Sequence, residues 1–115
     1  MISNLIFKII NKFFKINETK EEQKNLKILL GHSVLDKRKF DSTNINDYEL
    51  KIFSQFGEDG IIDYLIKRLE INNKYFIEFG VEDYDEANTR FLLEGKNWKG
   101  EIYEANRKFV EIIKS

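Results

Sequence analysis

The stretch from Tyr75 to Asn106 constrains the fold of this chain more than any other. It begins with the aromatic and β-branched run Tyr75–Phe79, which is typical of a short strand. A polar loop follows, then the helix-forming run FLLEG, and then a second strand pattern at Glu101–Tyr103. Strand, helix and strand in this order form a βαβ unit, whose two strands run parallel. The sequence therefore predicts an α/β fold.

The end of the first strand carries the first candidate site residues. Apolar side chains occupy both faces of this strand, so we expect both faces to be covered. Glu78 is the exception, because a carboxylate there is costly unless it has hydrogen-bond donors. In open α/β sheets this edge is where ligands bind, which points to Glu78 and Gly80. In the structural alternative, Glu78 binds only backbone amides and Gly80 serves only the turn.

A second candidate acid, Glu104, is identified by its spacing from Gly80 in the sequence. Glu104 follows Gly80 by 24 positions and ends the second strand, near the ~20-residue interval between a cofactor-loop glycine and the acid that binds ribose hydroxyls. As an alternative, Glu104 is only a solvated strand end. The loop after Gly80 is not GxGxxG, and its acids at Glu82 and Asp83 would repel a pyrophosphate. This disfavours NAD and favours a ribose cofactor with a cationic or zwitterionic end, such as S-adenosylmethionine.

The combined motif resembles a known family. SQFGEDGII, followed by FIEFGVEDYDEANTRFLLEGKNWKG and a strand-end acid, is similar to FkbM-like class I S-adenosylmethionine-dependent methyltransferases. The likeness covers roughly Ser54 to Asn106 and is strongest to the branch encoded alongside surface-polysaccharide genes. It implies the amino-terminal part of a Rossmann-like class I methyltransferase fold, with the first two parallel strands and their flanking helices. It also implies methyl transfer to a small-molecule or glycan acceptor, on an oxygen of a sugar or glycolipid.

The resemblance also implies a set of cofactor-binding residues. Glu78 and Gly80 match the acid and first glycine of the cofactor motif, and Glu104 matches the ribose acid. Four further residues are expected to line the same pocket by position: Gln55, Gly57, Asn88 and Thr89. Gln55 has a structural alternative as a helix cap only. Two later glycines of the family's loop are replaced here by Glu82 and Tyr84, and no residue can be named as catalytic.

The first residues predict an amphipathic helix. On residues 2–16 a narrow polar face contains Asn4, Lys8, Asn11, Lys12 and Lys15, and apolar side chains cover the remainder. The segment is too short to span a bilayer. Two alternatives follow: the helix packs on the protein or on a second subunit of a homo-oligomer, or it lies in a membrane interface.

Residues 18–47 predict a second helix and a connector. The helix is expected to end at Gly31, and residues 31–47 to form a poorly ordered linker in which His32 is a surface histidine. This gives an amino-terminal helical segment over residues 1–47 and the start of a methyltransferase domain over residues 48–115. A further amphipathic helix is predicted from Glu58 onward.

The composition excludes several functions. A net charge of −1 gives no case for nucleic-acid binding, and the absence of cysteine with a single histidine excludes the usual metal motifs. Without a signal peptide the expected location is cytoplasmic, with peripheral contact at the inner membrane face as an extension. Because parallel sheets normally need more strands, we expect a truncated part of a longer methyltransferase. The alternative function is a non-catalytic protein that associates with a membrane or partner through its first helix.

Overall fold

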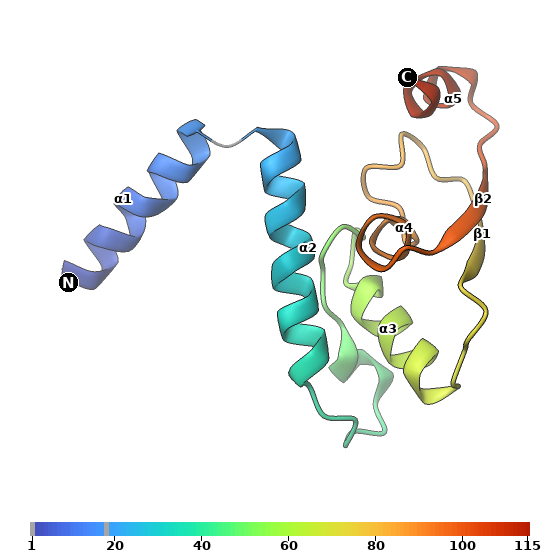
Figure 1. Ribbon diagram of the computed structural model, residues 1–115, viewed down its shortest axis with the longest axis horizontal. Coiled ribbons are helices and arrows are strands. Elements are labelled where there is room, and N and C mark those ends of the chain that lie inside the picture. Colours follow the sequence, from blue (N-terminus) through green and yellow to red (C-terminus); the bar gives the residue numbers. More distant parts are fainter. Residues whose placement is uncertain (1, 18) are drawn as a thin grey trace.

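The computed structural model describes residues 2–17 and 19–115 and has a mixed α/β architecture (Figure 1). The elements follow one another as α1 (Ile2–Asn17), α2 (Lys20–Lys37), the 3₁₀ helix η1 (Ile45–Tyr48), α3 (Glu58–Arg68), β1 (Tyr75–Phe79), α4 (Arg90–Lys96), β2 (Lys99–Tyr103) and α5 (Arg107–Lys114). β1 and β2 pair in parallel, with α4 between them in the sequence. The predicted α/β class and the parallel strand pair are therefore confirmed.

The sheet is covered on one face only within the described residues. Phe76 of β1 packs with Leu92 and Trp98, and α3 adds Ile62 and Ile66 to this cluster. The alternate side chains of β1 are exposed instead, at 44% for Tyr75, 57% for Ile77 and 73% for Phe79. The prediction that both faces of β1 are covered is thus wrong here, because successive strand side chains point to opposite faces and only one face meets helices.

The register of the two strands explains a glycine in β2. Phe76 lies opposite Gly100, and a Cβ at Gly100 would lie 2.5 Å from the Phe76 ring. The absent side chain therefore lets the aromatic ring lie flat over the neighbouring strand. β2 begins at Lys99, two residues before the predicted start, since this glycine belongs to the ladder and not to a turn.

A second core joins α2 to the α/β part of the chain. Leu35, Ile52, Phe53 and Phe91 form it, with Ile28 and Leu50 packed against it. Gly31 lies in the middle of α2, where a Cβ would meet Ile52 Cδ1 at 2.5 Å. Gly31 therefore permits close packing and does not end the helix, which continues to Lys37. The predicted helix end and the start of the connector at residue 31 are wrong for this reason.

His32 also departs from the prediction. Its side chain is half-buried, its Nε2 lies 2.7 Å from the carbonyl oxygen of Gly95, and its ring lies 5.2 Å from that of Phe91. Since a carbonyl can only accept, Nε2 is the donor in this contact. His32 thus ties α2 to α4 and is not a free surface histidine.

One buried acid connects three segments that lie far apart in the sequence. Asp63 on α3 is 1% exposed at its side chain and pairs with Arg38 at 3.2 Å, with Lys67 at 2.9 Å and with Lys96 of α4. Desolvation raises the pKa of Asp63, but hydrogen bonds and charge from Lys96 and Lys67 outweigh it. The net effect holds the pKa below its ordinary value of 3.8. The charged carboxylate therefore stabilises the fold.

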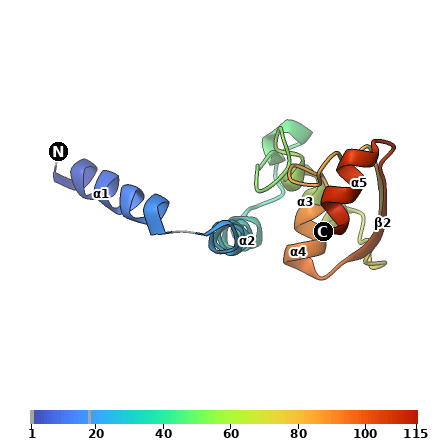
Figure 2. The same cartoon turned by 90° about the horizontal axis from the view of Figure 1, so that it is seen from above.

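α1 stands apart from the rest of the chain. It extends away from α2 and from the sheet in both views (Figures 1 and 2). Among residues 2–17 and 19–115, no helix is long and apolar enough to cross a membrane. The predicted amino-terminal helix is confirmed, and its described apolar side chains, Leu5, Ile6, Phe7, Ile9 and Ile10, are exposed.

Candidate functional site

A cavity of about 410 Å³ opens beside the carboxyl end of β1. This volume lies in the usual range for small-molecule sites, ~300–1,000 Å³. Three segments line the cavity: the loop before α3, the end of β1, and the loop between β1 and α4. The lining residues are Gln55, Phe56, Glu58, Glu78, Gly80, Val81, Glu82, Asp83, Asp85, Glu86, Ala87 and Asn88.

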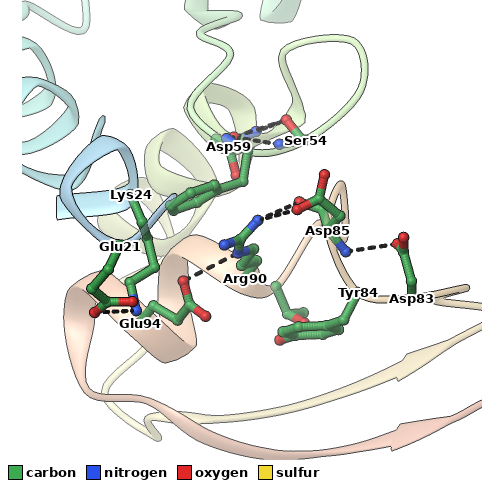
Figure 3. Close-up of polar contacts among 11 residues, drawn as sticks. Glu21, Lys24, Ser54, Asp59, Asp83, Tyr84, Asp85, Arg90 and Glu94 are labelled. Carbon is green, nitrogen blue, oxygen red and sulfur yellow. Dashed lines mark hydrogen bonds and ion pairs between the residues drawn. The ribbon is translucent and has the colours of Figure 1, made fainter. Parts of the chain in front are cut away.

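The first wall is held in place by Asp59, near the start of α3 (Figure 3). Its Oδ2 accepts hydrogen bonds from the amides of Ile52, Phe53 and Ser54 at 2.8, 2.6 and 2.8 Å. It also accepts one from the Ser54 hydroxyl at 2.9 Å. These bonds fold the chain into a tight loop, which places Gln55 at the cavity wall.

Gly57 closes this loop without entering the cavity. Its φ of +101° is the left-handed conformation that glycine adopts without strain, and its carbonyl accepts a bond from the Leu50 amide at 3.1 Å. Gly57 is buried and precedes the first residue of α3. Gly57 therefore supports the fold of the loop without lining the cavity, whereas the exposed Gln55 lines it.

Glu78 connects β1 to the start of α4. Its Oε1 accepts from the Asn88 amide at 3.0 Å, and its Oε2 accepts from the Thr89 amide at 3.0 Å and from the Thr89 hydroxyl. These donors satisfy a half-buried carboxylate that would otherwise be costly. Glu78 therefore binds two backbone amides and one side-chain hydroxyl, and not backbone amides only as in the structural alternative.

Gly80 makes the turn out of β1. Its φ is +68°, its amide donates to the Tyr103 carbonyl at 2.9 Å, and the space where a Cβ would stand has no atom within 4 Å. Glu82 and Tyr84 in the same loop also have positive φ, at 53° and 71°. The loop thus tolerates side chains at left-handed positions, and the space beside Gly80 is open.

Glu104 reaches back from the end of β2 to this loop. Its Oε1 accepts from the Glu82 amide and its Oε2 from the Asn106 amide, both at 2.8 Å. These amide bonds, that of Asn106 first, hold the pKa of the Glu104 carboxyl below its ordinary value. A carboxylate offers about four lone-pair sites, so the two amides fix its position and leave room for further donors.

Arg90 braces the second wall (Figure 3). Its guanidinium binds the carboxylate of Asp85 at 2.9 Å and that of Glu94 at 3.1 Å. It also lies 4.2 Å from the centre of the Phe53 ring, which belongs to the loop of the first wall. The Tyr84 hydroxyl is 2.8 Å from that of Thr89. The acidic loop is therefore tied both to α4 and to the opposite wall.

The cavity is strongly acidic. Six carboxylates line it, and none of the lining residues is basic. Burial raises the pKa of Glu58, but hydrogen bonds from its own amide and from that of Phe56 outweigh this and lower it overall. Despite these acids, no group of three or more potential ligands in the described part of the chain is arranged to hold a metal ion. The carboxylates give the cavity a negative electrostatic potential, which attracts cations.

The predicted site residues are partly brought together. Gln55, Glu78, Gly80 and Asn88 line the cavity, and Thr89 supports it by binding Glu78. Glu104 lies outside this cavity, in a second hollow that also includes Gly80. Gly57 is a structural residue of the loop.

The sequence pattern left several lining residues unnamed. Asp85 and Glu86 lie in the acidic stretch VEDYDEA, whose charge was the available signal, and Glu58 was named only as the start of a predicted helix. Phe56 and Ala87 had no signal, because nothing in their spacing separates a lining residue from a loop residue.

Comparisons with family models, with curated proteins and with solved structures found no match for this chain. A function therefore has to follow from the cavity, from the second hollow and from the residues that shape them.

Proposed function

We propose that the chain is an S-adenosylmethionine-dependent methyltransferase of the FkbM-like class I type, with a Rossmann-like fold. The acceptor would be an oxygen of a sugar or glycolipid. The observation that carries this proposal is the position of Gly80, which borders both the acidic cavity and the second hollow. A ligand that crosses the open space at Gly80 has one end among carboxylates and the other beside Glu104.

The second hollow suits an adenosine group. It measures about 420 Å³ and is lined by Phe79, Gly80, Tyr103, Glu104 and Ala105. The rings of Phe79 and Tyr103 stack at 5.1 Å and form an apolar surface of the kind on which bases stack. Glu104 has lone pairs left for two vicinal ribose hydroxyls, and its lowered pKa keeps it an acceptor at neutral pH.

The acidic cavity suits the methionine end of the cofactor. Its carboxylates attract a sulfonium and an ammonium group, and the loop amides of Asn88 and Thr89 are already taken up by Glu78. The same acids would repel a pyrophosphate. Placing like charges next to each other in a binding interface costs on the order of several kcal/mol. This separates the proposal from a dinucleotide-binding function.

When bound, S-adenosylmethionine would supply an electrophilic methyl group on sulfur. The residues of this chain then serve to bind and orient, because such a transfer depends on placing donor and acceptor in line. Gln55 and Glu58 lie on the first wall of the cavity, and Glu78 fixes the second wall. Glu104 would bind the ribose hydroxyls.

The test is calorimetric titration of the chain with S-adenosylmethionine. We expect saturable heat, and a loss of affinity of at least about tenfold in Glu104→Ala, since one hydrogen bond to a charged group contributes ~1.5–3 kcal/mol. Glu111→Ala is the matched control: Glu111 is an exposed acid of α5 that lines neither hollow. It should leave the affinity within about twofold.

Two results would contradict the proposal. One is saturable binding of NAD with no heat from S-adenosylmethionine. The other is binding of S-adenosylmethionine that Glu104→Ala and Glu111→Ala weaken equally, which would place the ligand away from Glu104.

A further inference from the structure

α1 presents a wide apolar surface that no described element covers. The exposed fractions are 60% for Leu5, 50% for Ile6, 63% for Phe7, 59% for Ile9 and 45% for Ile10. In both views α1 lies away from α2 and from the sheet (Figures 1 and 2). Five large apolar side chains on a single helix are thus in contact with solvent.

The polar side of α1 is narrow and positively charged. At 100° per residue Asn4, Lys8 and Lys12 fall within about 80° of one another, and the five apolar side chains spread over the opposite ~200°. The α1 sequence contains three lysines and no acid. A broad apolar face with a basic polar face is the pattern of a helix that lies flat in a membrane interface.

The charge pattern distinguishes a lipid surface from a second copy of the helix. Paired helices present a narrower apolar stripe and place opposite charges beside each other along its edges. Two copies of α1 would bring only lysines together, whereas an anionic lipid surface complements them. At 16 residues α1 is also shorter than the ~20 needed to span a bilayer.

We propose that α1 binds anionic membrane surfaces, lying in the interface with Leu5, Ile6, Ile9 and Ile10 in the lipid and Lys8 and Lys12 at the headgroups. α1 makes none of the contacts that build the cavity at β1. Binding is therefore independent of the proposed cofactor site, and each can fail without the other.

The test is co-sedimentation of the full chain with vesicles of phosphatidylcholine and phosphatidylglycerol, with pure phosphatidylcholine vesicles alongside. We expect binding to the anionic vesicles that weakens as salt is added. Lys8→Ala/Lys12→Ala should weaken it roughly thirtyfold, from about fivefold for each lysine near an anionic surface. On pure phosphatidylcholine the same variant should behave as the unsubstituted chain does.

A matched pair separates apolar insertion from charge alone. Ile6→Asp and Asn4→Asp change the net charge equally, but only the first places a carboxylate on the apolar face. We expect Ile6→Asp to bind at least about tenfold more weakly than Asn4→Asp, from the loss of one buried isoleucine. Unchanged far-ultraviolet circular dichroism and Trp98 fluorescence would show that both variants are folded.

Three outcomes would overturn the proposal. The first is no binding of the full chain to the anionic vesicles, and the second is equal binding of Ile6→Asp and Asn4→Asp. The third is a dimer in light scattering that Ile6→Asp dissociates, together with no vesicle binding, which would assign the apolar face to a second copy of the chain.

Discussion

Replacing Asp59 tests whether one buried carboxylate holds the first wall of the cavity. Asp59 is 2% exposed, and its Oδ2 is the acceptor for three successive backbone amides, at Ile52, Phe53 and Ser54. In Asp59→Ala these buried donors lose their acceptor. Among the described residues these three amides have no other acceptor than this carboxylate.

The expected loss of stability follows from the number of donors. Each buried amide left without a partner costs ~1–3 kcal/mol, so three give about 3–6 kcal/mol after allowing for relaxation. That is a large part of the ~5–15 kcal/mol that stabilises a domain. Asp59→Asn can keep an oxygen at the same position without the charge. It should therefore lose less, about 1–3 kcal/mol.

The assay is urea unfolding followed by the fluorescence of Trp98, which is the only tryptophan and is 7% exposed. Asp36→Ala, an exposed acid on α2, is the control and should change the free energy of unfolding by less than about 0.5 kcal/mol. A loss below about 1 kcal/mol in Asp59→Ala would refute the reasoning. So would an Asp59→Asn variant less stable than Asp59→Ala.

Two further predictions concern helix glycines and pH. Helix propensity alone predicts that Gly60→Ala and Gly31→Ala each stabilise by ~1 kcal/mol. A Cβ at Gly60, however, would lie 2.1 Å from the backbone oxygen of Tyr48, so Gly60→Ala should destabilise by about 2–3 kcal/mol. In Gly31→Ala the new methyl group first meets the flexible end of the Ile52 side chain, so the free energy of unfolding should change by no more than about 1 kcal/mol. Equal urea midpoints for Gly60→Ala and Gly31→Ala would contradict this reasoning. The pKa of Asp63 is lowered on folding. The charged carboxylate therefore stabilises the folded state above pH 3.8, and this stabilisation is lost as the pH falls through the folded-state pKa. Urea midpoints measured across this pH range should fall less in Asp63→Asn than in the unsubstituted chain.

The sequence predicted the elements whose signals are local. The run Tyr75–Phe79 became β1 with the predicted bounds, and the helix predicted from Glu58 onward is α3, which begins at Glu58. In both cases the residues that determine the outcome lie within a few positions of one another. The edge of the sheet could be located for the same reason, since Glu78 and Gly80 follow directly from the strand.

The sequence did not predict features that depend on residues distant in the chain. Gly31 carries a local signal for a helix end, but packing against Ile52 and Phe91 places it inside α2. Asp59 has the local signal of a helix-dipole acid, and its three amide bonds become visible only when the preceding loop is folded. Glu104 was predicted from its spacing and from the family resemblance, but neither could show its bond to the Glu82 amide, which depends on how the loop after Gly80 turns.

The contact of Arg90 with Phe53 has a consequence for how a ligand enters. Because the guanidinium lies over a ring of the opposite loop at 4.2 Å and also binds Asp85 and Glu94, the two walls cannot swing apart without breaking it. Entry by separation of the loops is therefore disfavoured, and the proposed ligand would reach the carboxylates from the open side at Gly80. The two walls are therefore held at a fixed separation, and the rate at which a ligand associates with the site should depend little on loop motion.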